Sequence, residues 1–190
     1  MENGPPSPNP QFFLGLSHVY SLIARALLAR IGMAERVAVE QPPESLALIE
    51  PVLESLKETR ESRILELSSS RCRKDLDKTS RIAWGRVLER FYEDNGYAVE
   101  KGYLEPDHVA VQLAFVAYMM GDIAHSLSKS NYHEASEKII VLHRFFSAHL
   151  MPTLSQCDDP VARRIGELAR LTLSLLRPMA ITAAKRKRSA

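Results

Sequence analysis

The chain has 190 residues, of which 45% are apolar and 25% are charged, and its formal net charge is +2. This composition is typical of a soluble globular protein and excludes a disordered chain. The length suits one hydrophobic core with at most a small appendage. The apolar run at residues 109–121 is shorter than the ~20 residues that a membrane-spanning helix needs, so we expect no span.

Apolar residues recur at spacings of three and four along the chain, which predicts amphipathic helices. After a proline-rich segment at residues 1–10, which we expect to be flexible, the first helix ends before Gly32. Its apolar stripe consists of Phe12, Leu16, Val19, Ile23 and Leu27. A second helix is predicted after Pro42 and Pro43, with Pro51 starting a new turn.

Two further helices are predicted before the middle of the chain. One lies within residues 60–67, although the three serines that follow at residues 68–70 weaken the pattern, and the other extends from Ser80 to about Gly96. The next helix, residues 106–127, is apolar on most of its circumference, so we expect it to be the central helix. Pro106 suits its first turn because the N–H that proline lacks has no intrahelical partner there.

Two helices close the predicted domain. Asn131 and Glu134 have the spacing of a capping box for the first, which continues to Pro152. Asp159 and Pro160 start the second, which we expect to end at Pro178. No alternating strand pattern occurs in the sequence. The predicted class is all-α, a single-domain helical bundle over residues 11–178 with a basic, disordered tail at residues 179–190.

Charge is unevenly distributed. Residues 91–108 contain five acidic residues and one lysine, whereas residues 185–188 are all basic. The acidic block predicts either a solvated linker or a docking site for a basic peptide, because carboxylates accept the paired N–H groups of arginine. The basic tail lacks interleaved aromatic residues, so we expect no nucleic-acid partner.

The two cysteines, Cys72 and Cys157, are far apart in sequence and form no C-x-x-C pair. We therefore expect both to be inert thiols in a reducing compartment, with a disulfide between them as the less favoured alternative.

The histidines stand in no known metal-ligand pattern, and nucleotide-binding glycine motifs are absent from the sequence. We therefore predict no metal, no cofactor and no enzyme. One alternative remains, a small-molecule or metal-dependent helical enzyme centred on Asp122, His125 and His149, because Asp122 and His125 share a helix face.

Three segments carry a family resemblance in the stretch between residues 84 and 152. They are Tyr92 with Gly96, then Glu105, Pro106, Asp107 and His108 ahead of Leu113, Phe115 and Met119, and finally residues 146–152. In this order and spacing they resemble the TorD/DmsD family of redox-enzyme maturation chaperones. The resemblance implies a TorD-like helical bundle.

The resemblance also implies a function. Such a protein is a cytoplasmic chaperone that binds the twin-arginine signal peptide of a molybdopterin-containing oxidoreductase subunit and holds it until the cofactor is inserted. It works as a monomer or a domain-swapped homodimer, without stable membrane insertion. A general helical interaction scaffold is a further alternative.

A receptor for such a leader needs hydrogen-bond acceptors beside an apolar groove. Glu105, Asp107 and His108 are the candidate acceptors, and Asp107 alternatively serves only as a helix cap. Candidate groove residues are Trp84, Leu88 and Tyr92, which equally suit a hydrophobic core.

Overall fold

The computed structural model describes residues 8–33, 49–99 and 104–189. These residues form helices and no β-strand, with one isolated bridge between Ser68 and His108, so the prediction of an all-α bundle is confirmed. The helices are α1 (Pro10–Arg30), α2 (Glu50–Glu58), α3 (Glu61–Leu65), α4 (Ser69–Cys72), α5 (Lys78–Glu93), α6 (Val109–Ser128), α7 (Tyr132–Phe145), the π-helical η2 (Phe146–Leu150), α8 (Met151–Gln156) and α9 (Pro160–Ser189).

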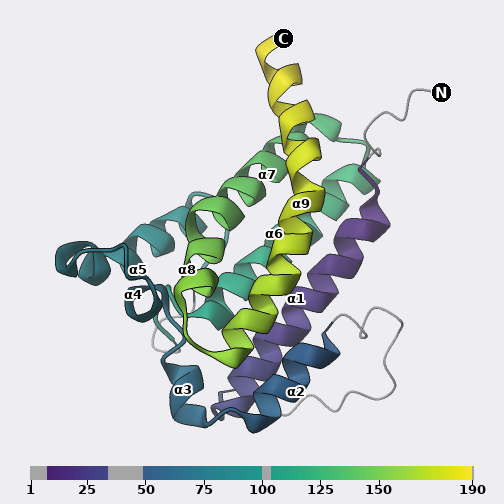
Figure 1. Ribbon diagram of the computed structural model, residues 1–190. Helices are drawn as coiled ribbons and strands as arrows, with labels where there is room; N and C mark the ends of the chain where they lie inside the picture. Colours follow the sequence, from purple (N-terminus) through teal and green to yellow (C-terminus); the bar gives the residue numbers. More distant parts are fainter. Residues whose placement is uncertain (1–7, 34–48, 100–103, 190) are drawn as a thin grey trace.

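The apolar helix α6 lies at the centre of the bundle, as its composition predicts. Figure 1 shows α1 and α9 running along it, with α7 beside them and the short helices α3 and α4 near one end. Small residues allow α1 and α6 to approach closely at one point of their contact. Ser17 Oγ donates a 2.7 Å hydrogen bond to the carbonyl of Ala117, and a Cβ at Gly121 would lie 3.4 Å from the same hydroxyl.

A cluster of aromatic rings fills the space between α5, α6 and α7. Phe115 of α6 contacts rings of both neighbouring helices, with centroid distances of 4.8 Å to Tyr92 and 4.7 Å to Phe145. Phe91 adds an edge contact to Phe115 at 5.8 Å. Tyr92, Phe115 and Phe145 are fully buried, so this cluster anchors α5 to the bundle through apolar burial and ring packing.

Several predicted helix boundaries are confirmed. Pro51 lies in the first turn of α2, Asn131 caps α7 by accepting a hydrogen bond from the Glu134 N–H, and Asp159 accepts one from the Val161 N–H at the start of α9. Gly32 follows α1 with a positive φ of 73°, a conformation that favours glycine. The prolines at positions 42 and 43 lie outside the described residues.

Two boundary predictions are wrong. Pro106 does not begin the central helix, because α6 starts at Val109 with His108 as its N-cap. Pro178 does not end the last helix, because α9 continues through it to Ser189 and so includes most of the segment predicted to be a disordered tail. The carbonyl left without a backbone donor by a proline inside a helix can be solvated on an exposed face, and Pro178 is exposed. The predicted domain limits stay a prediction.

Two described helices, α1 and α6, are long and apolar enough by length and composition alone to cross a membrane. In the bundle, 72% of the apolar window of α6 is buried, compared with 33% of that of α1. The expectation of no span considered residues 109–121 alone, and did not include α1 or the residues that extend the apolar stretch of α6. The burial of α6 is that of a core helix.

A buried hydrogen bond joins the first and last helices. Tyr20 Oη donates to Thr172 Oγ1 at 2.8 Å, and both residues are almost completely buried. We expect Tyr20→Phe to lower the free energy of unfolding by about 1–3 kcal/mol, because the Thr172 hydroxyl loses its partner in the core. Urea denaturation measures the change. The double variant Tyr20→Phe/Thr172→Val should recover part of the loss, whereas strictly additive losses would contradict this role for the pair.

Candidate functional site

Residues of α4, of α5 and of the stretch just before α6 line a small pocket, here called the corner pocket. Its volume is about 320 Å³, and it is lined by Ser70, Arg81, Ile82, Gly85, Glu105 and Asp107. Glu105 and Asp107 belong to a turn closed by a 2.9 Å hydrogen bond from the His108 N–H to the Glu105 carbonyl. Glu105 is exposed, and Ile82 presents 77% of its surface to solvent. The pocket therefore combines carboxylates with an exposed aliphatic side chain.

Asp107 is a structural member of this pocket. Only 3% of its surface is exposed, and Oδ2 accepts a 2.7 Å hydrogen bond from the Ser70 N–H. Its backbone carbonyl accepts hydrogen bonds from the Ser69 N–H at 2.9 Å and from Gln112 Nε2 at 2.8 Å. The carboxylate thus lies against the first turn of α4, where backbone donors compensate for its burial. Asp107 does not cap α6, the alternative role considered for it, because His108 is the N-cap of that helix.

His108 faces the protein interior. Its Nδ1 accepts a hydrogen bond from the Ala110 N–H at 3.1 Å, and its Nε2 lies 2.9 Å from the Ile64 carbonyl, to which the protonated nitrogen donates. Burial lowers the pKa of His108 below its usual value, which favours the neutral ring that both contacts require. With both nitrogens occupied, His108 fixes the start of α6.

The three candidate groove residues do not form one surface. Leu88 and Tyr92 are fully buried, and Tyr92 Oη donates to the Pro106 carbonyl at 3.0 Å, which supports the corner from inside. Trp84 is half-buried, with the Arg73 guanidinium 4.6 Å from its ring centroid. The structure therefore brings Glu105 and Asp107 together at one pocket and places His108, Leu88 and Tyr92 behind it.

Sequence reasoning missed the pocket residues that α4 and α5 contribute. Ile82 and Gly85 lie three residues apart and so are neighbours on the surface of α5, where Gly85 borders the buried stripe of Leu88 and Tyr92 and Ile82 lies farther out in solvent. The sequence did offer one signal for this part of the pocket, because Ile82 is an aliphatic residue that lies outside the apolar stripe of its helix. Ser70 had no such signal, because α4 has only four residues and depends on its tertiary contacts.

Helix α4 is fixed to α8 by a dense set of contacts beside the corner pocket. Pro152 has no N–H, so the Ala148 carbonyl lacks its usual helical donor, and Arg73 Nη1 donates to it at 3.2 Å. Ser69 and Thr153 share a 2.7 Å hydrogen bond between their hydroxyls. The π-helix η2 lies just before Pro152. A π-turn at this position accommodates the disruption that proline causes in the hydrogen-bond ladder of the helix.

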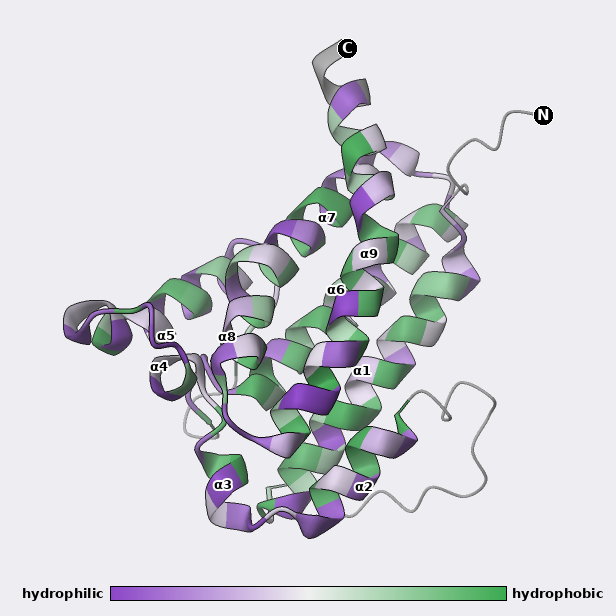
Figure 2. Cartoon of the chain, viewed as in Figure 1, coloured by the Kyte–Doolittle hydropathy of each residue, from purple (hydrophilic) through white to green (hydrophobic). Residues whose placement is uncertain are grey.

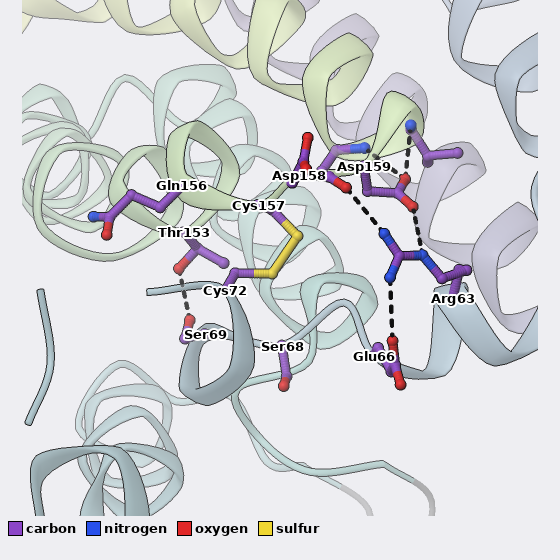
Figure 3. Close-up of a disulfide and its surroundings, with 12 residues drawn as sticks. Arg63, Glu66, Ser68, Ser69, Cys72, Thr153, Gln156, Cys157, Asp158 and Asp159 are labelled. Carbon is purple, nitrogen blue, oxygen red and sulfur yellow. Dashed lines mark hydrogen bonds and ion pairs between the residues drawn. A yellow bond between two sulfur atoms is a disulfide. The ribbon is translucent and has the colours of Figure 1, made fainter. Parts of the chain in front are cut away.

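A disulfide between Cys72 and Cys157 also joins α4 to the turn between α8 and α9 (Figure 3). The prediction that both cysteines are free thiols is therefore wrong for this structure. The sequence did not reveal this pairing, because the two cysteines become neighbours only when the chain returns to α4 after α5, α6 and α7. Next to the disulfide, Arg63 donates to the Asp158 carbonyl at 3.1 Å, and its guanidinium lies 3.9 Å from Asp159 Oδ2 (Figure 3).

The alternative enzyme centre is not assembled. Asp122 Oδ2 pairs with Lys138 Nζ at 2.7 Å, an ion pair between α6 and α7. His149 lies eleven residues beyond Lys138 along the same helical stretch, a rise of about 16 Å. Among the described residues, no group of three or more histidine, cysteine, aspartate or glutamate side chains is placed to hold a metal ion. Asp122 and His149 therefore belong to different parts of the bundle.

The fold and the corner pocket together define a helical protein with a small acidic surface site. The family model described as nitrate reductase delta subunit matches residues 86–157, from α5 to the cysteine that follows α8. This family is a TorD-like family of redox-enzyme maturation chaperones, so the resemblance carried by the sequence is confirmed. The matched stretch contains Glu105 and Asp107 and ends at Cys157, whereas Ser70 and Ile82 precede it.

The disulfide leads to a stability prediction. Its two cysteines are 85 residues apart, so the chain-entropy model gives about 4–5 kcal/mol as the stabilisation that reduction removes. Urea denaturation with and without dithiothreitol should show this loss for the wild-type protein. The double variant Cys72→Ser/Cys157→Ser should match the reduced protein and no longer respond to the reductant. A wild-type protein whose stability ignores the reductant would contradict the cross-link.

His149 leads to a prediction about pH. Burial, and secondarily the charge of Arg73, lower its pKa from 6.5 to about 4. The unfolded chain therefore binds more protons between these values, so stability is complete above pH 6.5 and falls as the pH drops towards 4. His143 and His108 shift in the same direction.

The variant His149→Phe isolates the contribution of His149. Phenylalanine suits the site because the His149 ring packs 5.2 Å from Phe91 and 5.4 Å from Phe145. The variant should lose less stability than the wild type between pH 7 and 4.5, measured by thermal denaturation. Parallel pH profiles for the two proteins would show that His149 does not titrate in this range.

Proposed function

We propose that this protein is a cytoplasmic chaperone that binds the twin-arginine signal peptide of a molybdopterin-containing oxidoreductase subunit and holds it until the cofactor is inserted. The family match supports the coarser role, maturation of a molybdoenzyme. The corner pocket supports the finer one.

The observation that carries the proposal is the composition of the corner pocket. A twin-arginine leader presents guanidinium groups next to an apolar segment. Glu105 offers an exposed carboxylate that can accept paired N–H donors, and Ile82 offers an exposed aliphatic surface in the same pocket. Neither side chain has an evident role in the core, since both are exposed.

The remaining predicted site residues take supporting roles in this proposal. Asp107 adds negative charge at the pocket wall while it holds α4. His108 and Tyr92 hold the connecting segment from inside, through Ile64 and Pro106 respectively. These residues position the pocket, and Glu105 contacts the peptide.

Arg81 distinguishes this pocket from a purely acidic one. Its Nε donates to the Leu76 carbonyl at 3.0 Å, which keeps the guanidinium at the pocket. A leader arginine that approaches Glu105 therefore meets a like charge as well as an opposite one. Arg81 should limit the affinity, and its removal should strengthen binding of an arginine leader.

The client in this proposal is the catalytic subunit of a nitrate-reductase-type molybdoenzyme, the kind of enzyme named by the matched family. The chaperone acts in the cytoplasm as a monomer or a domain-swapped homodimer, before the client is exported. The disulfide means that cysteine usage gives this compartment no support, because disulfides persist mainly in oxidising compartments. Cell fractionation with thiol alkylation before lysis tests the compartment and the redox state together.

Paired charge variants test the pocket. We expect Glu105→Gln to weaken binding of a twin-arginine leader by about fivefold, since an exposed ion pair contributes up to about 1 kcal/mol, and Arg81→Gln to strengthen it. Isothermal titration calorimetry with Arg-Arg and Lys-Lys versions of the peptide measures both changes. The Glu105→Gln protein should also discriminate less between the two peptides.

Two controls make the result specific. Glu93→Gln removes an exposed charge from the same acidic block, outside the pocket, and should leave binding unchanged. Asp107→Asn should lower the melting temperature, because it weakens a charge-assisted hydrogen bond to the Ser70 N–H. If Glu105→Gln and Glu93→Gln behave alike, the corner pocket is not the peptide site.

A further inference from the structure

Helix α9 carries a concentration of positive charge that the proposed peptide site does not use. It contains eight basic residues and one acidic residue, a net charge of +7, whereas the whole chain has a net charge of +2. The rest of the protein therefore has a net charge of −5. Such segregation of charge on one element is typical of a surface that meets an anionic partner.

Several arginines of α9 are exposed to solvent. Arg163, Arg170 and Arg177 are exposed. Arg164 forms an ion pair with Glu167 within α9. Burial, and secondarily the charge of Arg177, lower the pKa of His143 on α7. Two exposed guanidinium groups, those of Arg170 and Arg177, thus lie along the middle of the helix, and that of Arg163 lies in its first turn.

The same solvent-facing half of α9 also exposes large aliphatic side chains. Leu171, Leu175 and Ile181 present 59%, 48% and 49% of their surface to solvent. They are interspersed along the helix with Arg170 and Arg177, and Figure 2 shows that hydrophobic and hydrophilic residues are mixed along α9. At 100° per residue, Arg170, Arg177 and Ile181 lie on the side of the helix opposite Ile165, Thr172 and Leu176, which are buried, whereas Leu171 and Leu175 lie along one edge of this outer side.

From this arrangement we infer that the outer face of α9 binds peripherally to an anionic membrane surface. Basic side chains are attracted to anionic lipid headgroups, and exposed aliphatic side chains enter the interface between headgroups and acyl chains. Nucleic acid accounts for the arginines but leaves the three aliphatic side chains in water. Figure 1 shows the C-terminal end of α9 extending beyond the other helices, which gives a flat surface access to it.

Peripheral binding of this kind differs from insertion. The inner face of α9 contributes to the core, with Ile165, Ala169 and Leu176 fully buried, so the helix stays part of the bundle while its outer face contacts the lipid. The acidic corner pocket lies near α4 and α5, away from this face. The bilayer and a basic leader can therefore bind at the same time.

Vesicle cosedimentation of the full chain tests the inference. The protein should bind vesicles that contain phosphatidylglycerol and not vesicles of phosphatidylcholine alone, and binding should weaken as sodium chloride is raised. Arg170→Gln/Arg177→Gln should lower the partition coefficient by about ten- to thirtyfold at low salt, since each basic residue near an anionic surface contributes about fivefold. Leu171→Ser/Leu175→Ser should also lower it, and more visibly at high salt.

Matched variants elsewhere on the surface are the controls. Arg86→Gln/Arg90→Gln removes two exposed charges from α5, and Leu65→Ser removes an exposed leucine from α3. Both should bind vesicles like the wild type, and circular dichroism should show that all four variants fold.

Three outcomes would overturn the inference. The first is equal loss of binding in the α5 and α9 charge variants, which would show attraction by overall charge alone. The second is binding to phosphatidylcholine vesicles as strong as to anionic vesicles. The third is retention of duplex DNA or an acidic polypeptide, insensitive to the leucine variants, without vesicle binding.

Discussion

The buried start of α6 is the constraint on which the surrounding structure depends. A helix N-terminus inside a protein exposes backbone N–H groups that must find partners. Here the Val109 N–H donates to the Leu67 carbonyl at 2.7 Å, and the Ala110 N–H donates to His108 Nδ1. Satisfying these donors brings residues 64–70 against the beginning of α6. The position of α4 follows from that requirement.

The location of α4 in turn determines both the corner pocket and the attachment of α8. Asp107 accepts a hydrogen bond from the Ser70 N–H on one side of α4, and Thr153 shares a hydrogen bond with Ser69 on the other. Arg73 supplies the donor that Pro152 denies to the Ala148 carbonyl, and Cys72 adds a covalent link to Cys157. A four-residue helix, which would not be stable alone, is held by polar contacts and a disulfide.

Two surfaces of opposite character result. The corner pocket offers Glu105 beside an aliphatic side chain, which suits a peptide with guanidinium groups. The outer face of α9 offers arginines beside aliphatic side chains, which suits an anionic layer. The net charge of +2 is the sum of +7 on α9 and −5 elsewhere. The total therefore conceals the segregation of charge that distinguishes the two surfaces.

The helical class could be predicted because the period of the apolar residues is a local property, and caps such as Asn131 and Asp159 act on their own helices. The family resemblance could likewise be recognised from the sequence, because it depends on short segments in a fixed order and spacing. The site was only partly predictable. Glu105 and Asp107 were identified from their charge, but the sequence did not show that Asp107 would turn towards α4.

Tertiary structure alone decided which residues became neighbours. Tyr92 and Leu88 were compatible with a groove or a core, and packing against Phe115 and the rest of the bundle placed them in the core. The pairing of Cys72 with Cys157 depends on the return of the chain after three helices, a long-range event that no local pattern encodes. Periodicity determines which face of a helix is apolar, whereas the contacts that this face makes are fixed only when all the helices pack together.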